Sequence, residues 1–288
     1  MMDRRTFVIA GGALLLAGCG KGPQRIAVGT KNFTEQLVLG ELLAQSIENQ
    51  THAAVERRFY LAGSYICHQA ILSGRIDMYV EYTGTALAAI LKLPIRRDSR
   101  QVFETVRDEY QKRFHLTVLP SLGFNNTFAI AMRGDEARAK GIRTLSDLAK
   151  YAPQMRLGVG YEFLEREDGF PGLAKTYGLK FAAAPAVMDL GLLYRALESK
   201  QVDVVAGSNT DGLIAALRLV VLEDDKHYFP PFDAVPIVRP EALARAGVRE
   251  ALDRLTGRIS TDDMRRMNYA VDGEKRDASD VVREFLRR

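Results

Sequence analysis

The stretch AILSGRIDMYVEYTGT, residues 70–85, reads as the end of a helix, a turn, a buried strand and the start of a second helix. The stretch ALESKQVDVVAGSNTD, residues 196–211, repeats this order after a shift of 126 residues, with Ala, Ser and Asp at matching positions. The shift places Tyr82 opposite Ser208, each where a strand ends. Ligands bind at this carboxyl edge of open α/β sheets. Three identities can also arise by chance, but the repeat predicts two similar lobes facing a cleft.

The rest of the chain alternates segments of strand and helix character. Strands are expected at residues 26–29, 54–60, 76–81, 127–132, 156–160, 202–206 and 219–222. Helices are expected at residues 34–49, 64–72, 100–114, 144–150, 172–177, 190–199 and 211–217, with further helices after Pro240. This alternation predicts an α/β fold with two open, mostly parallel sheets and helices on both faces.

The chain is expected to cross between the lobes twice, around residues 123–126 and around residues 229–232. Lobe 1 then comprises residues 25–124 plus 231–288, and lobe 2 comprises residues 125–230. The two crossings form a two-stranded hinge. Closure of such a hinge traps a solute between the lobes.

The N-terminus has the layout of a secretory signal peptide over residues 1–18. Asp3-Arg4-Arg5 supplies positive charge and Phe7–Ala17 is almost wholly apolar or glycine. The apolar run is shorter than the roughly 20 residues that span a bilayer. Arg4-Arg5-Thr6-Phe7 is also similar to a twin-arginine export signal, so the export route stays open.

Leu16-Ala17-Gly18-Cys19 resembles a bacterial lipobox, which implies cleavage before Cys19 and attachment of a lipid to its thiol. Residues 19–24 would then form a tether to the membrane. The alternative is an ordinary signal peptide with a chance cysteine. If Cys19 is lipidated, Cys67 is the only thiol left, so the mature chain is expected to be stable without an intramolecular disulfide.

The composition is that of a globular protein, with 47% hydrophobic residues and a formal net charge of +4 in 288 residues. Lys and Arg clusters are all short, so the sequence indicates no nucleic-acid partner. The four His residues are scattered, which predicts no metal and no cofactor. Cys67 and His68 diverge by about 100° on a helix, so they are not expected to form a catalytic pair.

Several segments carry a resemblance to a known family. They are Gly29–Gln36, Cys67-His68, Glu81–Thr85, Gly123–Thr127, Glu162-Phe163 with Arg166 and Asp168-Gly169, Thr210–Gly212 and Leu222–His227. In this order they resemble the glycine betaine/choline/carnitine-binding proteins of osmoprotectant ABC importers, over nearly the whole mature chain. Gly207–Gly212 is most similar to the OsmF/YehZ-like branch. The resemblance implies a two-lobed periplasmic-binding-protein fold of type II.

The resemblance also implies ligand contacts. A trimethylammonium group has no N–H to donate, so ring faces select it. Tyr82, Phe128 and Phe232 are implied as walls of an aromatic cage. The residues implied to hold the ligand's carboxylate are Lys31, Thr85 and Arg166.

One position departs from the family pattern. Relatives often carry an aromatic residue where this chain has Ser208, so the cage lacks a wall and weak betaine binding, or preference for another or larger cation, is expected. Simpler interpretations stay open: Lys31 and Arg166 as surface charges, Tyr82 and Phe128 as packing residues, and Asn125-Asn126 as hinge turns.

The expected function is capture of a quaternary-ammonium osmoprotectant by hinge closure, as the substrate-binding protein of an ABC importer. The expected partners are the solute, an ABC permease of the inner membrane and the membrane that holds the lipid anchor. The protein is expected to be monomeric, periplasmic or otherwise in the cell envelope, and no enzyme. The alternative is a binding or sensor protein for another small cationic or zwitterionic solute.

Overall fold

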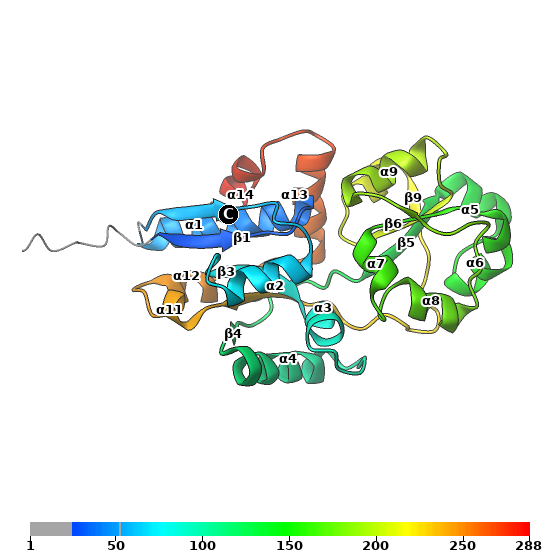
Figure 1. Ribbon diagram of the computed structural model, residues 1–288. Helices are drawn as coiled ribbons and strands as arrows, with labels where there is room; N and C mark the ends of the chain where they lie inside the picture. Colours follow the sequence, from blue (N-terminus) through cyan, green and yellow to red (C-terminus); the bar gives the residue numbers. More distant parts are fainter. Residues whose placement is uncertain (1–24, 52) are drawn as a thin grey trace, which may run out of the picture.

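The computed structural model describes residues 25–51 and 53–288. The expected signal peptide (1–18), tether (19–24) and lipidated Cys19 lie outside these residues. Figure 1 shows two α/β lobes side by side, joined by two passes of the chain. We call the part built on the first sheet lobe 1 and the part built on the second sheet lobe 2. The residues at which one lobe gives way to the other stay a prediction.

Lobe 1 contains a five-stranded sheet of order β2-β1-β3-β10-β4. The strands are β1 (Ile26–Gly29), β2 (Val55–Arg58), β3 (Met78–Tyr82), β4 (Thr117–Val118) and β10 (Ala234–Val238). The helices of this lobe are α1 (Thr34–Thr51), α2 (Ser64–Leu72), α3 (Thr83–Thr85), the π-helix η1 (Ala86–Ile90), α4 (Ser99–Phe114), α11 (Pro240–Leu243), α12 (Val248–Asp253), α13 (Thr261–Asp272) and α14 (Ala278–Leu286).

Lobe 2 contains a second five-stranded sheet, of order β7-β6-β8-β5-β9. The strands are β5 (Phe128–Arg133), β6 (Leu157–Val159), β7 (Ala186–Val187), β8 (Val204–Ser208) and β9 (Leu219–Val221). The helices are α5 (Gly134–Lys140), α6 (Leu145–Tyr151), the 3-10 helix η2 (Ala152–Gln154), α7 (Tyr161–Glu165), α8 (Phe170–Tyr177), α9 (Leu190–Glu198) and α10 (Leu213–Ala216).

The internal repeat is confirmed element by element. Shifting α2 and β3 by 126 residues gives the bounds of α9 and β8. The strands β3 and β8 also hold the same place, third in the order of their sheets. The predicted α/β fold with two open, mostly parallel sheets is therefore confirmed.

Each sheet contains one antiparallel strand, which the sequence did not predict. β10 runs antiparallel to β3 and β4, and β5 runs antiparallel to β8 and β9. Both are the first strands after the chain has crossed from the other lobe. A chain that arrives from the cleft enters the sheet at the carboxyl edge of its parallel strands, so it must run away from that edge.

The crossing segments pair with each other between the lobes. Asn125 forms an antiparallel bridge with Asp233, and the N–H of Asn126 donates to the carbonyl of Phe232 at 2.9 Å. The predicted crossings around residues 123–126 and 229–232 contain or adjoin these contacts.

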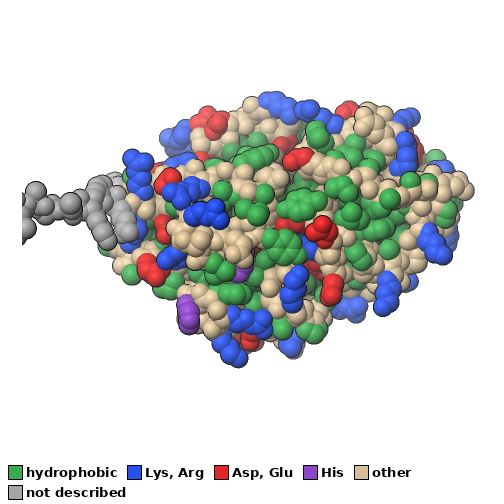
Figure 2. Space-filling view, in the orientation of Figure 1, with side chains coloured by type: hydrophobic (Ala, Val, Ile, Leu, Met, Phe, Trp, Pro, Cys, Tyr) green, Lys and Arg blue, Asp and Glu red, His purple; other side chains and the backbone are tan. Residues whose placement is uncertain are grey.

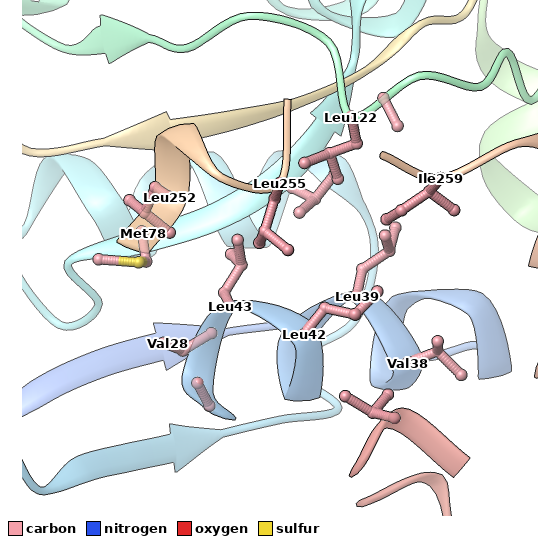
Figure 3. Packing of buried hydrophobic residues seen from close by; sticks show 14 of the residues in the cluster. Val28, Val38, Leu39, Leu42, Leu43, Met78, Leu122, Leu252, Leu255 and Ile259 are labelled. Carbon is pink, nitrogen blue, oxygen red and sulfur yellow. The ribbon is translucent and has the colours of Figure 1, made fainter. Parts of the chain in front are cut away.

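Helix α1 anchors the core of lobe 1 because its apolar residues recur with helical spacing. Leu39, Leu42 and Leu43 are fully buried, and Figure 3 shows them pointing toward Leu255 and Ile259. A separate apolar cluster fills lobe 2. Each lobe therefore has a core of its own.

The expected strand at residues 54–60 is shorter than predicted. It ends at Arg58 because Tyr60, with φ of 64°, is in the left-handed region, which an extended strand cannot contain. The expected helix at 211–217 is likewise only a single turn, α10. Helices α5 and α7 were not predicted.

Candidate ligand-binding site

A cavity of about 390 Å³ lies between the two lobes. Its lining contains all of the residues that the resemblance implied: Lys31, Tyr82, Thr85, Phe128, Arg166, Ser208 and Phe232. The structure thus brings together seven residues that lie between positions 31 and 232 of the sequence. Their contact with a ligand stays a prediction.

Strand ends explain why these residues meet. Tyr82 is the last residue of β3 and pairs with Ala234, the first of β10. Ser208 is the last residue of β8 and pairs with Phe128, the first of β5. Phe232 lies just before β10. All of these positions are at the sheet edges that face the cleft, the edge at which open α/β sheets bind ligands.

The aromatic side chains form one cluster across the two lobes. The ring of Phe128 lies 4.7 Å from Phe163, 5.3 Å from Phe232 and 5.5 Å from Phe229, centroid to centroid. Phe128 also contacts the apolar cores of both lobes. It therefore packs the core and lines the cavity at the same time.

Lys31 and Arg166 are buried, with 3% and 5% of their surface exposed, so the interpretation of both as surface charges is wrong. The Lys31 ammonium pairs with the buried carboxylate of Glu81 and lies 4.5 Å from the centroid of the Tyr82 ring. A protein cation therefore already occupies one face of the predicted cage wall.

Arg166 joins the lobes. Its Nε donates to Asp168 at 2.7 Å, and its Nη2 donates to the hydroxyl of Thr85, in lobe 1, at 3.1 Å. The guanidinium carbon lies 5.4 Å from the centroid of the Phe128 ring. The remaining nitrogen, Nη1, has no hydrogen-bond partner among the described residues. It is therefore available to a carboxylate in the cavity.

No ligand role was predicted from the sequence for the acidic residues of the cavity. Glu162, Asp189, Asp211 and Asp272 line it, and in residues 25–51 and 53–288 none of them forms an ion pair with Lys or Arg. Lys31 and Arg166 are already neutralised by Glu81 and Asp168. The lining therefore carries more negative than positive charge, which favours a cation.

Tyrosines stand beside these carboxylates. Tyr60, Tyr161 and Tyr194 line the cavity, and the hydroxyl of Tyr194 donates to Asp211. Tyr60 is 59% exposed and comes from lobe 1, whereas Asp189 caps helix α9 of lobe 2. Only the tertiary fold brings these residues together, and no sequence motif marks Tyr60 or Asp189.

Asp211 gives the cavity a pH-dependent charge. Burial raises the pKa of Asp211 to about 7. The hydrogen bonds from the hydroxyl of Tyr194 and, at 2.9 Å, from the N–H of Ser208 lower the pKa but do not offset the burial. Because the folded-state pKa exceeds the unfolded value near 3.8, the folded state binds more protons between about pH 4 and pH 7. Asp211 therefore lowers the free energy of unfolding as the pH rises through that window.

We expect Asp211→Asn to abolish this effect, since the amide oxygen still accepts both hydrogen bonds. For each pH unit in that window, the wild type should lose up to about 1.4 kcal/mol more stability than the variant. Thermal melting at pH 5, 6, 7 and 8 measures the difference, which should grow from pH 5 to about pH 7 and then level off. Parallel curves for the two proteins would show that Asp211 ionises normally in the folded state.

Cys67 and His68 are both buried in the packed interior. Burial raises the pKa of the Cys67 thiol to about 12, and His68 packs edge-on against Tyr110 and Phe114. Among the described residues no group of three or more His, Cys, Asp or Glu side chains could hold a metal ion. Nor does any described helix have the length and apolar character to cross a membrane.

Two lobes with separate cores, a paired crossing and an aromatic, acidic cavity between them define a two-lobed solute-binding protein. Residues 24–288 match the family described as the substrate-binding domain of the ABC-type glycine betaine transport system, and the chain belongs to this family. The predicted family and its fold are confirmed. Proteins of this family serve ABC importers, act outside the cytoplasm and work with a permease.

Individual relatives agree with this assignment. The carnitine transport binding protein OpuCC of Listeria monocytogenes is 34% identical, over 96% of this chain and 92% of that protein. The ergothioneine transport permease/ergothioneine binding protein EgtU of Helicobacter pylori is 36% identical, over 91% of this chain and 47% of that longer protein. A crystal structure of a glycine betaine/carnitine/choline ABC transporter has a TM-score of 0.75 at 34% identity, covering 91% and 97% of the two chains.

Proposed function

We propose that this substrate-binding protein captures a small quaternary-ammonium solute between its lobes and delivers it to an ABC permease. The observation that carries the proposal is the cavity itself. Its walls are aromatic, its two basic residues are neutralised by the protein's own carboxylates, and four further carboxylates line it. Ring faces and excess negative charge together select a cation that cannot donate hydrogen bonds.

The relatives support the same ligand class. Carnitine and ergothioneine, which name two of them, both carry a trimethylammonium group and a carboxylate. In this chain the trimethylammonium would lie against Tyr82, Phe128 and Phe232, and the carboxylate against Lys31, Thr85 and Arg166. With Ser208 in place of a fourth wall, we expect glycine betaine to bind weakly.

A ligand panel tests this proposal. The mature chain is screened by thermal shift with glycine betaine, choline, carnitine, ergothioneine, ectoine and arginine, and each hit is measured by calorimetry. A ligand at 100 times its Kd stabilises the folded state by about 2.7 kcal/mol, which raises the melting temperature by a readily detected amount. Stabilisation by arginine or ectoine with none by any trimethylammonium compound would disprove the proposed ligand class.

We also propose that the protein is a monomeric lipoprotein of the cell envelope and has no catalytic activity. The resemblance of Leu16–Cys19 to a lipobox supports the anchor. The signal-peptide-like sequence of residues 1–18 supports export, and the family of transport proteins supports a binding role without catalysis.

Cys19→Ala should abolish lipidation, because alanine has no thiol to accept the lipid. The variant should appear either uncleaved or released in soluble form. Mass spectrometry of the membrane and soluble fractions measures this, with Cys67→Ala as the matched control that keeps the lipid. A lipidated, membrane-bound Cys19→Ala protein would exclude Cys19 as the anchor.

A further inference from the structure

Glu35 lies behind the cavity wall, as the second residue of α1, and only 2% of its surface is exposed. Its Oε1 accepts hydrogen bonds from the hydroxyl of Tyr82 at 2.5 Å and from Nδ2 of Asn126 at 2.7 Å. Its Oε2 accepts from Nδ2 of Asn268 at 3.1 Å. The carboxylate thus binds one cavity wall, one crossing segment and helix α13.

Two of these partners lead on to lobe 2. The side-chain oxygen of Asn126 accepts a hydrogen bond from the hydroxyl of Ser208, and Nδ2 of Asn268 also donates to the carbonyl of Thr210 at 2.9 Å. Ser208 ends β8 and Thr210 follows it. Helix α13 lies on the side of lobe 1 that faces lobe 2 (Figure 1). Two separate routes, each of two hydrogen bonds, therefore connect Glu35 to the facing lobe.

This carboxylate has no charged partner within the described part of the chain. Amide and hydroxyl groups satisfy it, and it lies in the first turn of an 18-residue helix, where the helix dipole favours negative charge. Burying a carboxylate without a cation destabilises a fold. An apolar side chain would fill the space without that destabilisation, so packing alone does not explain an acid here.

The ring of Tyr82 explains what the acid does. A carboxylate that accepts a hydrogen bond from the phenol hydroxyl places negative charge on the side of Tyr82 remote from the cavity, which strengthens the attraction of the ring for a cation. One cation already lies against this ring, since the ammonium of Lys31 is 4.5 Å from the ring centroid. Gln36 adds a weaker hydrogen bond to the same hydroxyl, at 3.2 Å.

We propose that Glu35 is a positioning residue. It orients the ring of Tyr82 in the cavity wall and ties that ring to the contact between the lobes, so that a cation against Tyr82 and closure of the lobes stabilise each other. The cation part of this inference rests on the proposed function. The link between Glu35 and closure does not.

A double-mutant cycle tests the link to Tyr82. Calorimetry with choline and glycine betaine as probes compares the wild type, Glu35→Gln, Tyr82→Phe and the double variant. Each single change should weaken binding of both probes roughly five- to tenfold. The double variant should bind no more weakly than Glu35→Gln, because Tyr82→Phe removes the hydroxyl through which the charge of Glu35 acts on the ring. If the two losses multiply in the double variant, Glu35 does not act through Tyr82 and the proposal fails.

Glu41→Gln is the matched control. Glu41 lies on the same helix and is 6% exposed, but it binds Arg57 and Gln45 and does not line the cavity. Its loss should lower stability and leave the affinity for both probes within twofold. A general loosening of α1 would instead weaken binding equally in the two variants.

Small-angle X-ray scattering without any ligand tests the link to closure. Glu35→Gln places an amide donor against the donors of Tyr82, Asn126 or Asn268, so its lobes should separate and its radius of gyration should exceed that of the wild type and of Glu41→Gln. This measurement needs no ligand, so it tests the role in closure even if no quaternary ammonium compound binds the wild type. Absence of such binding would contradict only the proposed function. An unchanged radius in Glu35→Gln would overturn the role in closure.

Discussion

Arg166→Ala should weaken binding of glycine betaine roughly ten- to hundredfold and leave choline within about threefold of the wild type. A charge-assisted hydrogen bond contributes about 1.5–3 kcal/mol, and only the zwitterion has a carboxylate to receive it. The free Nη1 of Arg166 is the donor in question. Calorimetry with both ligands measures the ratio, and an equal loss for betaine and choline would remove Arg166 from the carboxylate site.

The same change should also destabilise the fold. Asp168 is fully buried and pairs with Arg166, so the single variant leaves an uncompensated buried carboxylate. This should lower the free energy of unfolding by about 3–5 kcal/mol. The double variant Arg166→Ala with Asp168→Ala removes both charges and should recover much of that loss in urea unfolding. It should still discriminate against betaine, because the donor to the ligand stays absent. This variant therefore separates binding from folding.

Ser208→Tyr should produce the second large change in ligand affinity. Ser208 pairs with Phe128 across adjacent antiparallel strands, so their side chains share the face that lines the cavity. A new ring there would add a cation–π contact of about 1–2 kcal/mol, or roughly fivefold to thirtyfold tighter binding. The gain should be alike for betaine and choline, since it acts on the trimethylammonium group.

Ser208→Ala is the control for this prediction. It breaks the hydrogen bond to Asn126 just as the tyrosine does, but adds no ring, so affinity should not rise. If Ser208→Tyr stays within twofold of the wild type for every quaternary ammonium compound while the fold is intact, position 208 does not contact the cation. A loss confined to the largest ligands would instead show that the ring occupies their space.

Local pattern made much of the site predictable from the sequence. Tyr82 and Ser208 end strands of the internal repeat, and the position of a strand end is set by residues close in the chain. The burial and pairing of Lys31 and Arg166 were not predictable, because no local pattern shows that Glu81 and Asp168 are the carboxylates with which they pair. Asp189, Asp272 and Tyr60 carry no motif, and only packing of the lobes collects them.

The paired crossing at Asn125 and Asp233 sets how far each part of the cavity moves. A rotation of the lobes about that line carries Phe128 and Phe232, which lie beside it, through a short arc. Tyr60 of lobe 1 and Asp189 of lobe 2 also line the cavity but lie outside the paired crossing, so rotation of the lobes changes their separation. Phe128 and Phe232 therefore keep their place in the cavity wall whether the lobes are open or closed, whereas contact of one solute with both Tyr60 and Asp189 would depend on closure.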